Sequence, residues 1–365
     1  MDFDDRYGWT DRLLHRAAFR LPLAQRTLAD VEETLYRDAL QAVSVENPVF
    51  LSSLPRAGTT ILLRLLWRTG RFATHTYRDM PFVLAPLLWR RLTGGGAAEA
   101  AARERAHGDG LTVSGRSPEA FEEMIWKHFW PDHYRDDHIR PWREGDRTPA
   151  FDAFFETHMR KMLALHRHDD DAPEGPDDTP RRYLSKNNLN IARLAAPPPG
   201  LRAGTVLIPF RAPLQQAASM RRQHRRFLQI HEEDDFVREY MAAIGHHEFG
   251  RTLKPVDFGG WLDEDPGDPE ALPFWLRYWT AAYRFVLEHA PDTAVLVSYR
   301  RLTEAPERAL AALGEALGVS PSLLTTQADA LRPPRTHPVD AEAVPASLRQ
   351  AADDVYDALD ARAAV

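Results

Sequence analysis

The stretch NPVFLSSLPRAGTTILLRLLW, residues 47–67, decides the fold. Residues 47–54 form a short apolar run, typical of a buried β-strand. A loop follows at residues 55–60, and residues 61–67 then have the near-continuous apolar pattern of a largely buried helix that ends near Gly70. The order strand, tight loop, helix predicts one unit of an α/β fold.

The loop at residues 55–60 has the composition of an anion-binding turn. Backbone N–H groups at the start of a helix lie at the positive end of its dipole and attract phosphate. Gly58 lets the backbone approach a phosphate closely, Thr59 and Thr60 add hydroxyl donors, and Arg56 adds charge. The loop lacks the Gly-x-x-x-x-Gly-Lys pattern of ATP and GTP sites. It is therefore either a phosphate cradle of another kind or an ordinary turn with a helix cap.

The rest of the chain continues the alternation of strands and helices. Strands are predicted at residues 183–185, 205–210 and 295–299. Helices follow the last two of these strands, and the first of these helices is expected to run through Ser219. An aromatic-rich helix is predicted over residues 275–288. Alternating strands and helices predict an α/β fold with a central parallel sheet that helices flank on both faces, with helical insertions.

A second candidate anion site follows the strand at residues 205–210. Arg211 stands where this strand ends, and Ser219 lies about two turns into the next helix. An arginine and a hydroxyl at this separation can converge on one phosphate. The alternative is a surface arginine and an ordinary helix serine.

Together, these two motifs resemble the sulfotransferase family, whose members transfer a sulfuryl group from 3′-phosphoadenosine-5′-phosphosulfate (PAPS). The resemblance covers about residues 47–320 and implies a three-layer, P-loop-like fold. It implies that the first loop holds the 5′-phosphosulfate and that the Arg–Ser pair holds the 3′-phosphate, which remains on the product 3′-phosphoadenosine-5′-phosphate. The residues implied to bind this co-substrate are Arg56, Ala57, Gly58, Thr59, Thr60, Arg211 and Ser219.

Three further segments resemble the same family. Residues 183–193 resemble its strand with a lysine, a polar turn and a helix that carries an arginine, here Arg193. Residues 275–283 resemble its aromatic helix, and residues 295–318 resemble its late strand and closing helix. The late strand often ends in Tyr-Glu, whereas here it ends in Tyr299 and Arg300, which we interpret as structural.

Sulfuryl transfer needs cations to stabilise the leaving phosphate and a base to take the acceptor's proton. Arg56 and Lys186 are predicted to be the cations, and Lys186 is one of only four lysines in the chain. Asp79, the first carboxylate after the loop, is predicted to be the base, unless it only forms a salt bridge with a nearby arginine. His75 and His107 are the alternative bases. No metal site is predicted.

Composition limits the class of protein. The chain has 365 residues, a net charge of -7 and no cysteine. The acidic balance argues against a general nucleic-acid binder, and the longest apolar stretch, residues 81–89, is too short to span a bilayer. The absence of cysteine excludes disulfides and zinc–thiolate sites. With no signal pattern at its start, the chain is expected to be cytoplasmic, without nucleic-acid or membrane partners.

We expect a single domain over residues 1–365 with its core at about residues 47–320. Around this core lie an N-terminal helical segment (1–45), a helical or lid insertion (about 93–146) with a helix that starts at Ser117, and a C-terminal helical tail (320–365). The predicted acceptor is a small molecule or glycan, and the oligomeric state cannot be predicted. The alternative functions are a nucleotide-dependent kinase or NTPase, and a sulfotransferase-like scaffold that binds nucleotide without catalysis.

Overall fold

The computed structural model describes residues 9–93, 103–104, 112–113, 115–167, 173, 175, 179–333 and 336–365. Its centre is a five-stranded sheet with the strand order β2-β5-β1-β6-β7, in which every pairing is parallel. The strands are β1 (Val49–Leu51), β2 (Phe72–Ala73), β5 (Arg182–Lys186), β6 (Thr205–Phe210) and β7 (Val295–Ser298). A separate antiparallel pair joins β3 (Arg103–Glu104) and β4 (Thr112–Val113).

The strand order reverses at β1. The chain goes from β1 to β2 and β5 on one side of the sheet and then to β6 and β7 on the other. Phe50, in the middle of β1, is in register with Ser185 of β5 and with Val206 of β6. In open parallel sheets, ligands bind outside the carboxyl ends of the strands at such a reversal. The loop after β1 lies at this position.

The strands alternate their side chains between two hydrophobic cores. In β1, Phe50 packs into the larger core, whereas Val49 and Leu51 pack into the smaller one on the opposite face. In β6, Ile208 faces the larger core and Leu207 the smaller one. A sheet that is apolar on both faces must be covered on both faces, which gives three layers.

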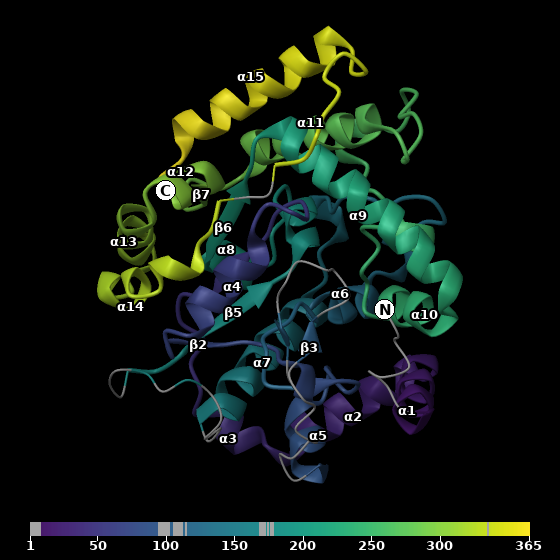
Figure 1. Ribbon diagram of the computed structural model, residues 1–365. Coiled ribbons are helices and arrows are strands. Elements are labelled where there is room, and N and C mark those ends of the chain that lie inside the picture. Colours follow the sequence, from purple (N-terminus) through teal and green to yellow (C-terminus); the bar gives the residue numbers. More distant parts are fainter. Residues whose placement is uncertain are drawn as a thin grey trace.

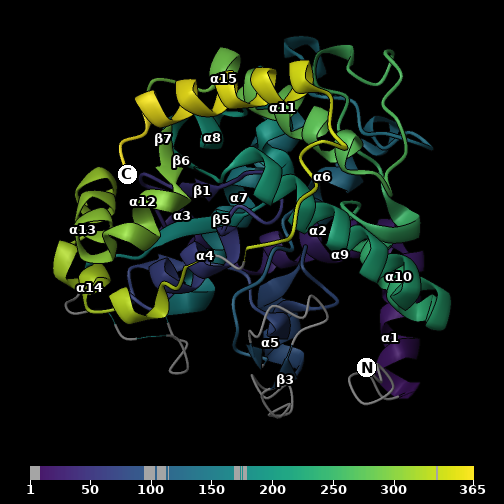
Figure 2. The ribbon, with the colours of Figure 1, turned by 45° about the horizontal axis from the view of Figure 1, so that its top comes forward.

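The helices that supply these cores lie on the two sides of the sheet (Figures 1 and 2). Residues of α4, α12, α13 and α14 fill the smaller core, and residues of α7, α9, α11 and α15 fill the larger one. The helices are α1 (Trp9–Arg20), α2 (Pro22–Leu35), α3 (Arg37–Gln41), α4 (Thr59–Trp67), α5 (Pro86–Leu92), α6 (Glu123–Phe129), α7 (Pro149–Arg167), α8 (Pro199–Ala203), α9 (Pro213–Glu233), α10 (Asp235–Ala243), α11 (Leu272–His289), α12 (Tyr299–Glu304), α13 (Pro306–Leu317), α14 (Pro321–Thr325) and α15 (Ala346–Arg362).

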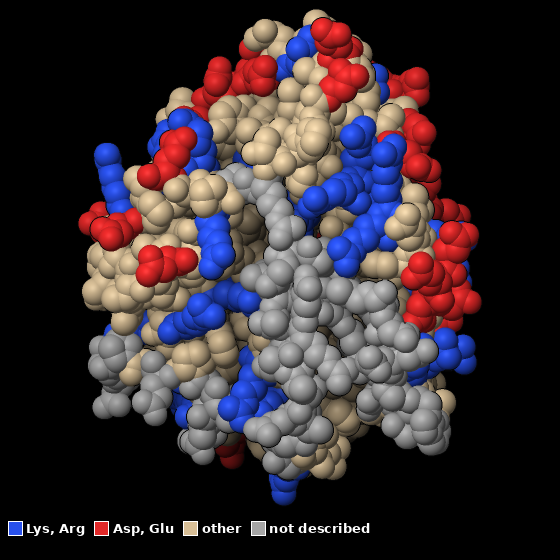
Figure 3. All heavy atoms as spheres, in the orientation of Figure 1, with Lys and Arg blue, Asp and Glu red and all other residues tan. Residues whose placement is uncertain are grey.

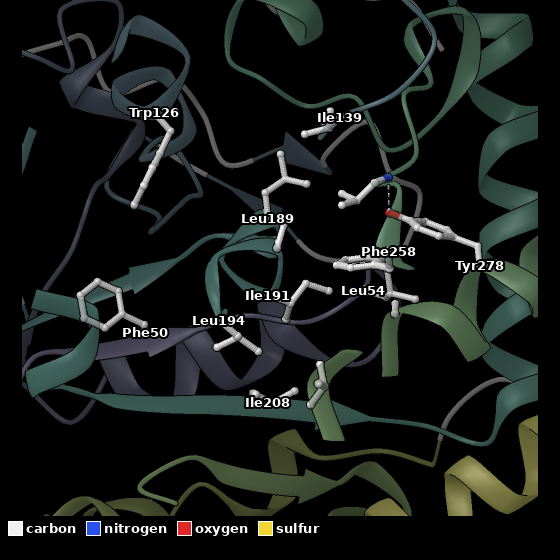
Figure 4. Close-up of a cluster of buried hydrophobic side chains, with 14 of the residues drawn as sticks. Phe50, Leu54, Trp126, Ile139, Leu189, Ile191, Leu194, Ile208, Phe258 and Tyr278 are labelled. Carbon is white, nitrogen blue, oxygen red and sulfur yellow. Dashed lines mark hydrogen bonds between the residues drawn. The ribbon is translucent and has the colours of Figure 1, made fainter. Parts of the chain in front are cut away.

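The larger core reaches the base of the loop after β1. Leu54, at the start of that loop, packs in one cluster with Ile208 of β6 and Phe258 (Figure 4). Tyr278 of α11 belongs to the same cluster, and its hydroxyl accepts the Val256 N–H over 3.2 Å. The apolar packing therefore holds the first residues of the loop against the sheet.

The prediction of an α/β fold with a central parallel sheet flanked by helices is confirmed. Two details of the prediction were wrong. The helix expected from Ser117 begins at Glu123, because Pro118 pairs with Thr76 in an isolated bridge and the Glu119 N–H donates to the His75 carbonyl. The helix after β6 extends to Glu233, well beyond the expected end at Ser219. The sequence analysis also missed β2, an edge strand.

The described residues include no helix that is both long enough and apolar enough to cross a membrane.

At the other edge of the sheet, β7 is covered by the last residues of the chain. The Ser298 N–H donates to the Val365 carbonyl over 2.7 Å, and the Ala364 N–H donates to the Leu296 carbonyl over 3.2 Å. The division into one domain with a core at residues 47–320 stays a prediction.

Candidate functional site

The loop between β1 and α4 has a left-handed backbone at two positions. Arg56 has a φ of 70° and Gly58 a φ of 99°. Gly58 is the N-cap residue of α4, and its carbonyl accepts the Leu62 N–H over 3.2 Å. Helix α4 therefore begins at Thr59, and the N–H groups of its first turn have no partner inside the helix. This is the arrangement that an anion site needs.

Position 58 also has no space for a side chain. A Cβ built on Gly58 would lie 2.5 Å from Cδ2 and Cε2 of Tyr299. Tyr299 is the first residue of α12 and directly follows β7, so its ring reaches the loop from the end of the edge strand. Glycine is required here both for the backbone angle and for the contact with the tyrosine ring.

Arg56 joins the loop to α9. Its Nε donates a hydrogen bond to Ser219 Oγ over 3.2 Å, although the two residues are 163 positions apart. Ser219 is almost fully buried in α9, whereas Arg56 is partly exposed. The structure thus brings together one residue from each of the two predicted phosphate motifs.

Arg211 lies beside the same site. Burial lowers its pKa, as does the neighbouring Arg222, while Tyr299 opposes this shift. Burial in turn raises the pKa of Tyr299, and both Arg211 and Arg56 oppose that shift. Arg56 and Arg211 therefore both act on the Tyr299 phenol, and Arg222 acts on Arg211. Positive charge concentrated in this way suits a phosphate ligand.

The surface agrees with this arrangement. On the face shown in Figure 3, Lys and Arg side chains gather around α9 and toward the middle, while Asp and Glu lie mainly toward the edge. The net charge of the whole chain is negative, so this face differs from the average surface. A basic region on an acidic protein attracts anionic ligands.

Gln216 of α9 supports the loop from inside the molecule. Its side chain is fully buried, and its Nε2 donates to the carbonyls of Leu54, over 3.4 Å, and Pro55, over 3.1 Å. Its Oε1 accepts the indole N–H of Trp279 over 2.9 Å. One glutamine therefore links the loop, α9 and the aromatic helix α11.

A second aromatic residue of α11 completes this support. The hydroxyls of Tyr283 and Ser53 lie 2.7 Å apart, and the Pro209 carbonyl lies 2.5 Å from Ser53 Oγ and 3.1 Å from the Tyr283 hydroxyl. Ser53 belongs to the segment after β1, and Pro209 belongs to β6. The resemblance did not say what the aromatic helix does, and here it holds the segment after β1 against the end of β6.

Lys186 is the last residue of β5, the neighbour of β1. Its Nζ lies 3.6 Å from Glu119 Oε1, and both side chains are largely buried. Glu119 Oε2 accepts the Tyr77 hydroxyl over 2.7 Å, and its Oε1 accepts the Ala120 N–H over 2.9 Å. Lysine, carboxylate and tyrosine thus form one polar group at the carboxyl end of the sheet.

The arginine after this strand has a structural role. Arg193 is fully buried, and its guanidinium carbon lies 3.8 Å from the Trp126 ring centroid and 4.1 Å from that of Trp142. The same guanidinium pairs with Glu123 at 2.8 Å. Paired charge and stacking stabilise the turn that follows Lys186.

Asp79 has the contacts of a helix cap. It is fully buried in the short helix η1 (Tyr77–Asp79), and its Oδ2 accepts the Thr76 N–H over 2.7 Å. Its Oδ1 lies 3.4 Å from Arg90 Nε, and its Oδ2 lies 3.8 Å from His75 Nδ1. Burial raises its pKa, but His75, Arg90 and the Thr76 N–H outweigh burial and hold the pKa below the ordinary value.

Of the two alternative bases, only His75 lies within the described residues. His75 is buried, with its Nε2 3.0 Å from His158 Nε2 and its Nδ1 3.8 Å from Asp79 Oδ2. His107 lies outside the described residues. Across the described ranges, no group of three or more His, Cys, Asp or Glu side chains could hold a metal ion.

Sequence reasoning missed two residues of the site. Tyr299 was interpreted as structural, yet it covers the loop at Gly58. Glu119 was only part of the expected helix start. From the sequence, the basic run at residues 221–226, which contains Arg222, is either an extension of the 3′-phosphate and adenine site or a solvated face. The position of Tyr299 after the last strand could have indicated it, because all parallel strands end at the same edge. No comparable signal pointed to Glu119, whose contact with Lys186 depends on the irregular segment at residues 115–120.

Comparisons with known proteins give the following. No protein-family model matches the chain, and no curated protein matches its sequence. Among solved structures, the chain is similar to the sulfotransferase STF1 from Mycobacterium tuberculosis H37Rv, with 14% identity, a TM-score of 0.45 and coverage of 95% of this chain and 85% of that one. It is similar to the sulfotransferase STF9 from Mycobacterium avium, with 13% identity, a TM-score of 0.46 and coverage of 89% and 80%. It is also similar to the sulfotransferase domain of the curacin biosynthetic pathway, with 11% identity, a TM-score of 0.34 and coverage of 86% and 99%.

Proposed function

We propose that the protein is a sulfotransferase that moves a sulfuryl group from PAPS to a hydroxyl or amine by in-line displacement. The observation that carries the proposal is the hydrogen bond from Arg56 Nε to Ser219 Oγ. It joins the loop that resembles a 5′-phosphosulfate site to the helix that resembles a 3′-phosphate site. PAPS carries phosphate at both the 3′ and the 5′ position of its ribose, so a site for it needs two such anion sites close together.

The residues present fit such a ligand. Gly58 keeps the loop backbone free of side-chain bulk, and Thr59 and Thr60 begin α4 with its N–H groups toward the loop. Arg211 and Ser219 stand at the end of β6 and in the helix that follows it. These groups lie at the carboxyl ends of β1, where the strand order reverses, and of its neighbour β6.

We assign the charge-stabilising roles to Arg56, Lys186 and the first turn of α4. In sulfuryl transfer, negative charge develops on the leaving phosphate, and donors fixed in advance lower the barrier without reorganisation. Lys186 ends β5 on one side of β1, and Arg56 belongs to the loop after β1 itself. The contact with Glu119 holds the Lys186 ammonium at this edge.

For the base that takes the acceptor's proton, we propose Glu119 ahead of Asp79. Asp79 is enclosed, and a carboxylate whose pKa is held low is a weak base. Glu119 instead lies 3.6 Å from Lys186, beside the groups assigned to the leaving phosphate. His75 and His107 stay as alternatives. The acceptor is proposed to be a small molecule or glycan, and the cytoplasmic location stays a prediction.

A thermal-shift experiment with 3′,5′-adenosine bisphosphate tests the donor site. A ligand that binds only the folded state raises the melting temperature by mass action. We expect a shift in the wild type, its loss in Arg211→Ala, and an unchanged shift in Arg308→Ala, an exposed arginine on α13. A shift with ATP and Mg²⁺ alone would support the kinase or NTPase alternative.

A transfer experiment then tests catalysis. The enzyme is incubated with PAPS and a panel of phenols, alcohols, amines and sugars, and release of 3′,5′-adenosine bisphosphate is measured. We expect release that depends on an acceptor and falls at least 100-fold in Lys186→Ala. Binding of the bisphosphate without release for any acceptor would instead support the non-catalytic scaffold.

A further inference from the structure

Tyr77 is the only partly exposed residue in the segment at residues 72–80. The other residues of this segment are buried, including the histidine and the aspartate considered above as bases. Glu119 and Lys186 are buried as well, with relative exposures of only 6% and 7%. Of the three side chains in the polar group formed by Tyr77, Glu119 and Lys186, the tyrosine is thus the one that an acceptor from solvent can contact most readily.

The Tyr77 hydroxyl is bonded directly to the carboxylate proposed as the base. It donates a hydrogen bond to Glu119 Oε2 over 2.7 Å. The other oxygen of the same carboxylate, Oε1, lies 3.6 Å from Lys186 Nζ. The phenol and the ammonium therefore lie at different oxygens of one carboxylate. A proton that arrives by way of the phenol reaches the carboxylate from the side away from the cation assigned to the leaving phosphate.

The backbone fixes the position of this tyrosine relative to the glutamate. The segments at residues 75–77 and 117–119 run antiparallel, with an isolated bridge at their centres and a hydrogen bond on each side of it, of 3.3 Å and 2.9 Å. Tyr77 and Glu119 are therefore diagonal neighbours across the bridge, a separation that an aromatic and a long side chain can span. The Tyr77 ring also packs edge-to-face on Phe121, with the ring centroids 5.5 Å apart.

A phenol has the chemistry that a relay needs. Its hydroxyl both donates and accepts a hydrogen bond, so it can pass on one proton while it receives another. An ionised carboxylate only accepts hydrogen bonds, and a lysine ammonium only donates them. Within the polar group, only Tyr77 can therefore stand between an acceptor hydroxyl and the Glu119 carboxylate and take part in both transfers.

We propose that Tyr77 is a catalytic residue that relays the acceptor's proton to Glu119, an inference that rests on the proposed sulfotransferase function. As the acceptor oxygen forms its bond to sulfur, its proton moves to Tyr77 Oη and the phenolic proton moves to Glu119 Oε2. The bond from sulfur to the bridging oxygen breaks, and its electron pair leaves on the 5′-phosphate. Tyr77 ends the step as a neutral phenol. Glu119 ends it as a carboxylic acid, which returns its proton to solvent through Tyr77 after the product leaves.

The chain offers a matched control for the loss of this hydroxyl. The Tyr183 hydroxyl donates to Glu122 Oε2 over 2.9 Å, which is a tyrosine–glutamate hydrogen bond of the same kind. Tyr183 is fully buried and packs in the larger core, so an acceptor cannot contact it. Removal of either hydroxyl should lower the melting temperature, because each leaves a carboxylate with one donor fewer. Only removal of the Tyr77 hydroxyl should slow transfer.

The single-turnover rate of bisphosphate release from PAPS tests the relay, because this rate excludes product release. The acceptor is the one in the panel above that gives the fastest release. We expect Tyr77→Phe to lower the rate at least 10-fold and to leave the affinity for 3′,5′-adenosine bisphosphate unchanged. Tyr183→Phe should keep the rate within a few-fold of the wild type. Tyr77→Phe combined with Glu119→Gln should be no slower than Glu119→Gln alone, because the two residues serve one step.

The number of protons that move in the step distinguishes a relay from a structural effect. In mixtures of H₂O and D₂O, the wild-type rate should depend quadratically on the deuterium fraction, because two protons move together. The rate of Tyr77→Phe should depend on it linearly, because one of these protons is gone. A tyrosine that only supports the fold would change the rate and leave the shape of this dependence as in the wild type.

The relay and the proposed function fail in different ways. A Tyr77→Phe rate within twofold of the wild type overturns the relay and leaves the transfer activity established. So does a linear dependence in the wild type, or a quadratic one that Tyr77→Phe retains. A wild type that binds 3′,5′-adenosine bisphosphate but releases none from PAPS with any acceptor overturns the proposed function, and the relay with it.

Discussion

The Nε of Arg56 and the Oγ of Ser219 are joined by a hydrogen bond of 3.2 Å, so the loop after β1 and the helix after β6 meet at one point. Ser219 is buried and held by the body of α9, whereas Arg56 belongs to a loop. The serine therefore orients the guanidinium, and one consequence can be tested by substitution at both ends.

Arg56→Lys keeps the charge but removes the Nε donor. We expect the affinity for 3′,5′-adenosine bisphosphate to fall about tenfold in this variant, which corresponds to about 1.4 kcal/mol, and by a similar factor in Ser219→Ala. Because both variants break the same hydrogen bond, the double variant should lose less than the sum of the two. Isothermal titration calorimetry measures the three affinities. Additive losses would mean that the two residues act separately.

Gly58→Ala should destabilise the protein through both the backbone angle and the Tyr299 ring. The left-handed backbone alone costs an alanine about 1–2 kcal/mol. Gly318→Ala is the matched control, because Gly318 has a φ of 63° and open space around its Cβ position. Urea denaturation should show a larger loss of unfolding free energy for Gly58→Ala than for Gly318→Ala. When Tyr299→Ala is added to Gly58→Ala, the part of the loss that exceeds that of Gly318→Ala should be recovered, because the ring is gone. Equal losses in Gly58→Ala and Gly318→Ala would contradict the contact between position 58 and the Tyr299 ring.

Asp79→Asn separates a structural from a catalytic role for this carboxylate. Loss of the charged cap in a buried site should lower the unfolding free energy by about 1–3 kcal/mol. Turnover per folded molecule should stay within a few-fold of the wild type. Glu119→Gln should lose turnover per folded molecule and also lower the melting temperature, because it removes the carboxylate that faces the buried Lys186 ammonium. The opposite pattern, an unchanged melting temperature and lost turnover in Asp79→Asn, would establish the base predicted from the sequence.

The stability of the protein should fall between about pH 6.5 and pH 4. Burial, first of all, lowers the pKa of His224 and of His231 to about 4, against an ordinary value of about 6.5. Their Nδ1 atoms accept the N–H groups of Gly250 and Arg251, at 3.1 and 3.2 Å, and so must remain unprotonated. Between the two pKa values the unfolded chain binds more protons than the folded one, so acid favours unfolding.

Each of these histidines contributes at most about 1.4 kcal/mol per pH unit in that range. Urea denaturation from pH 7 to pH 4 measures the slope for the whole chain. His224→Gln and His231→Gln keep a hydrogen-bond acceptor and remove the titration, so together they should flatten the curve. A slope equal to that of the wild type would exclude these two groups as its source.

Local patterns in the sequence were sufficient to predict four of the five strands of the sheet and the loop after β1. The strand at residues 205–210 matches β6, and the apolar run at residues 47–54 contains β1, because buried parallel strands are apolar on both faces. The contact between Arg56 and Ser219 itself was not predicted, but each residue follows a strand of one parallel sheet, which places both motifs at the same edge. The edge strand β2 has only two residues, too few for any periodicity.

The contact between Glu119 and Lys186 could not be predicted in the same way. Glu119 reaches Lys186 from an irregular segment whose course depends on the bridge between Thr76 and Pro118. Such a bridge joins residues far apart in sequence and leaves no periodic trace. Asp79 fits the expected position of a base in the chain, but the contact with Arg90 that encloses it appears only in the folded structure.

The left-handed backbone at Arg56 lowers the stability of the folded protein. An arginine with a φ of 70° occupies a conformation that costs an L-residue about 1–2 kcal/mol, whereas glycine adopts it freely. A population of variants screened only for heat tolerance would therefore drift toward glycine at this position and lose the cation. Any lineage in which arginine persists there is under selection for what the guanidinium does.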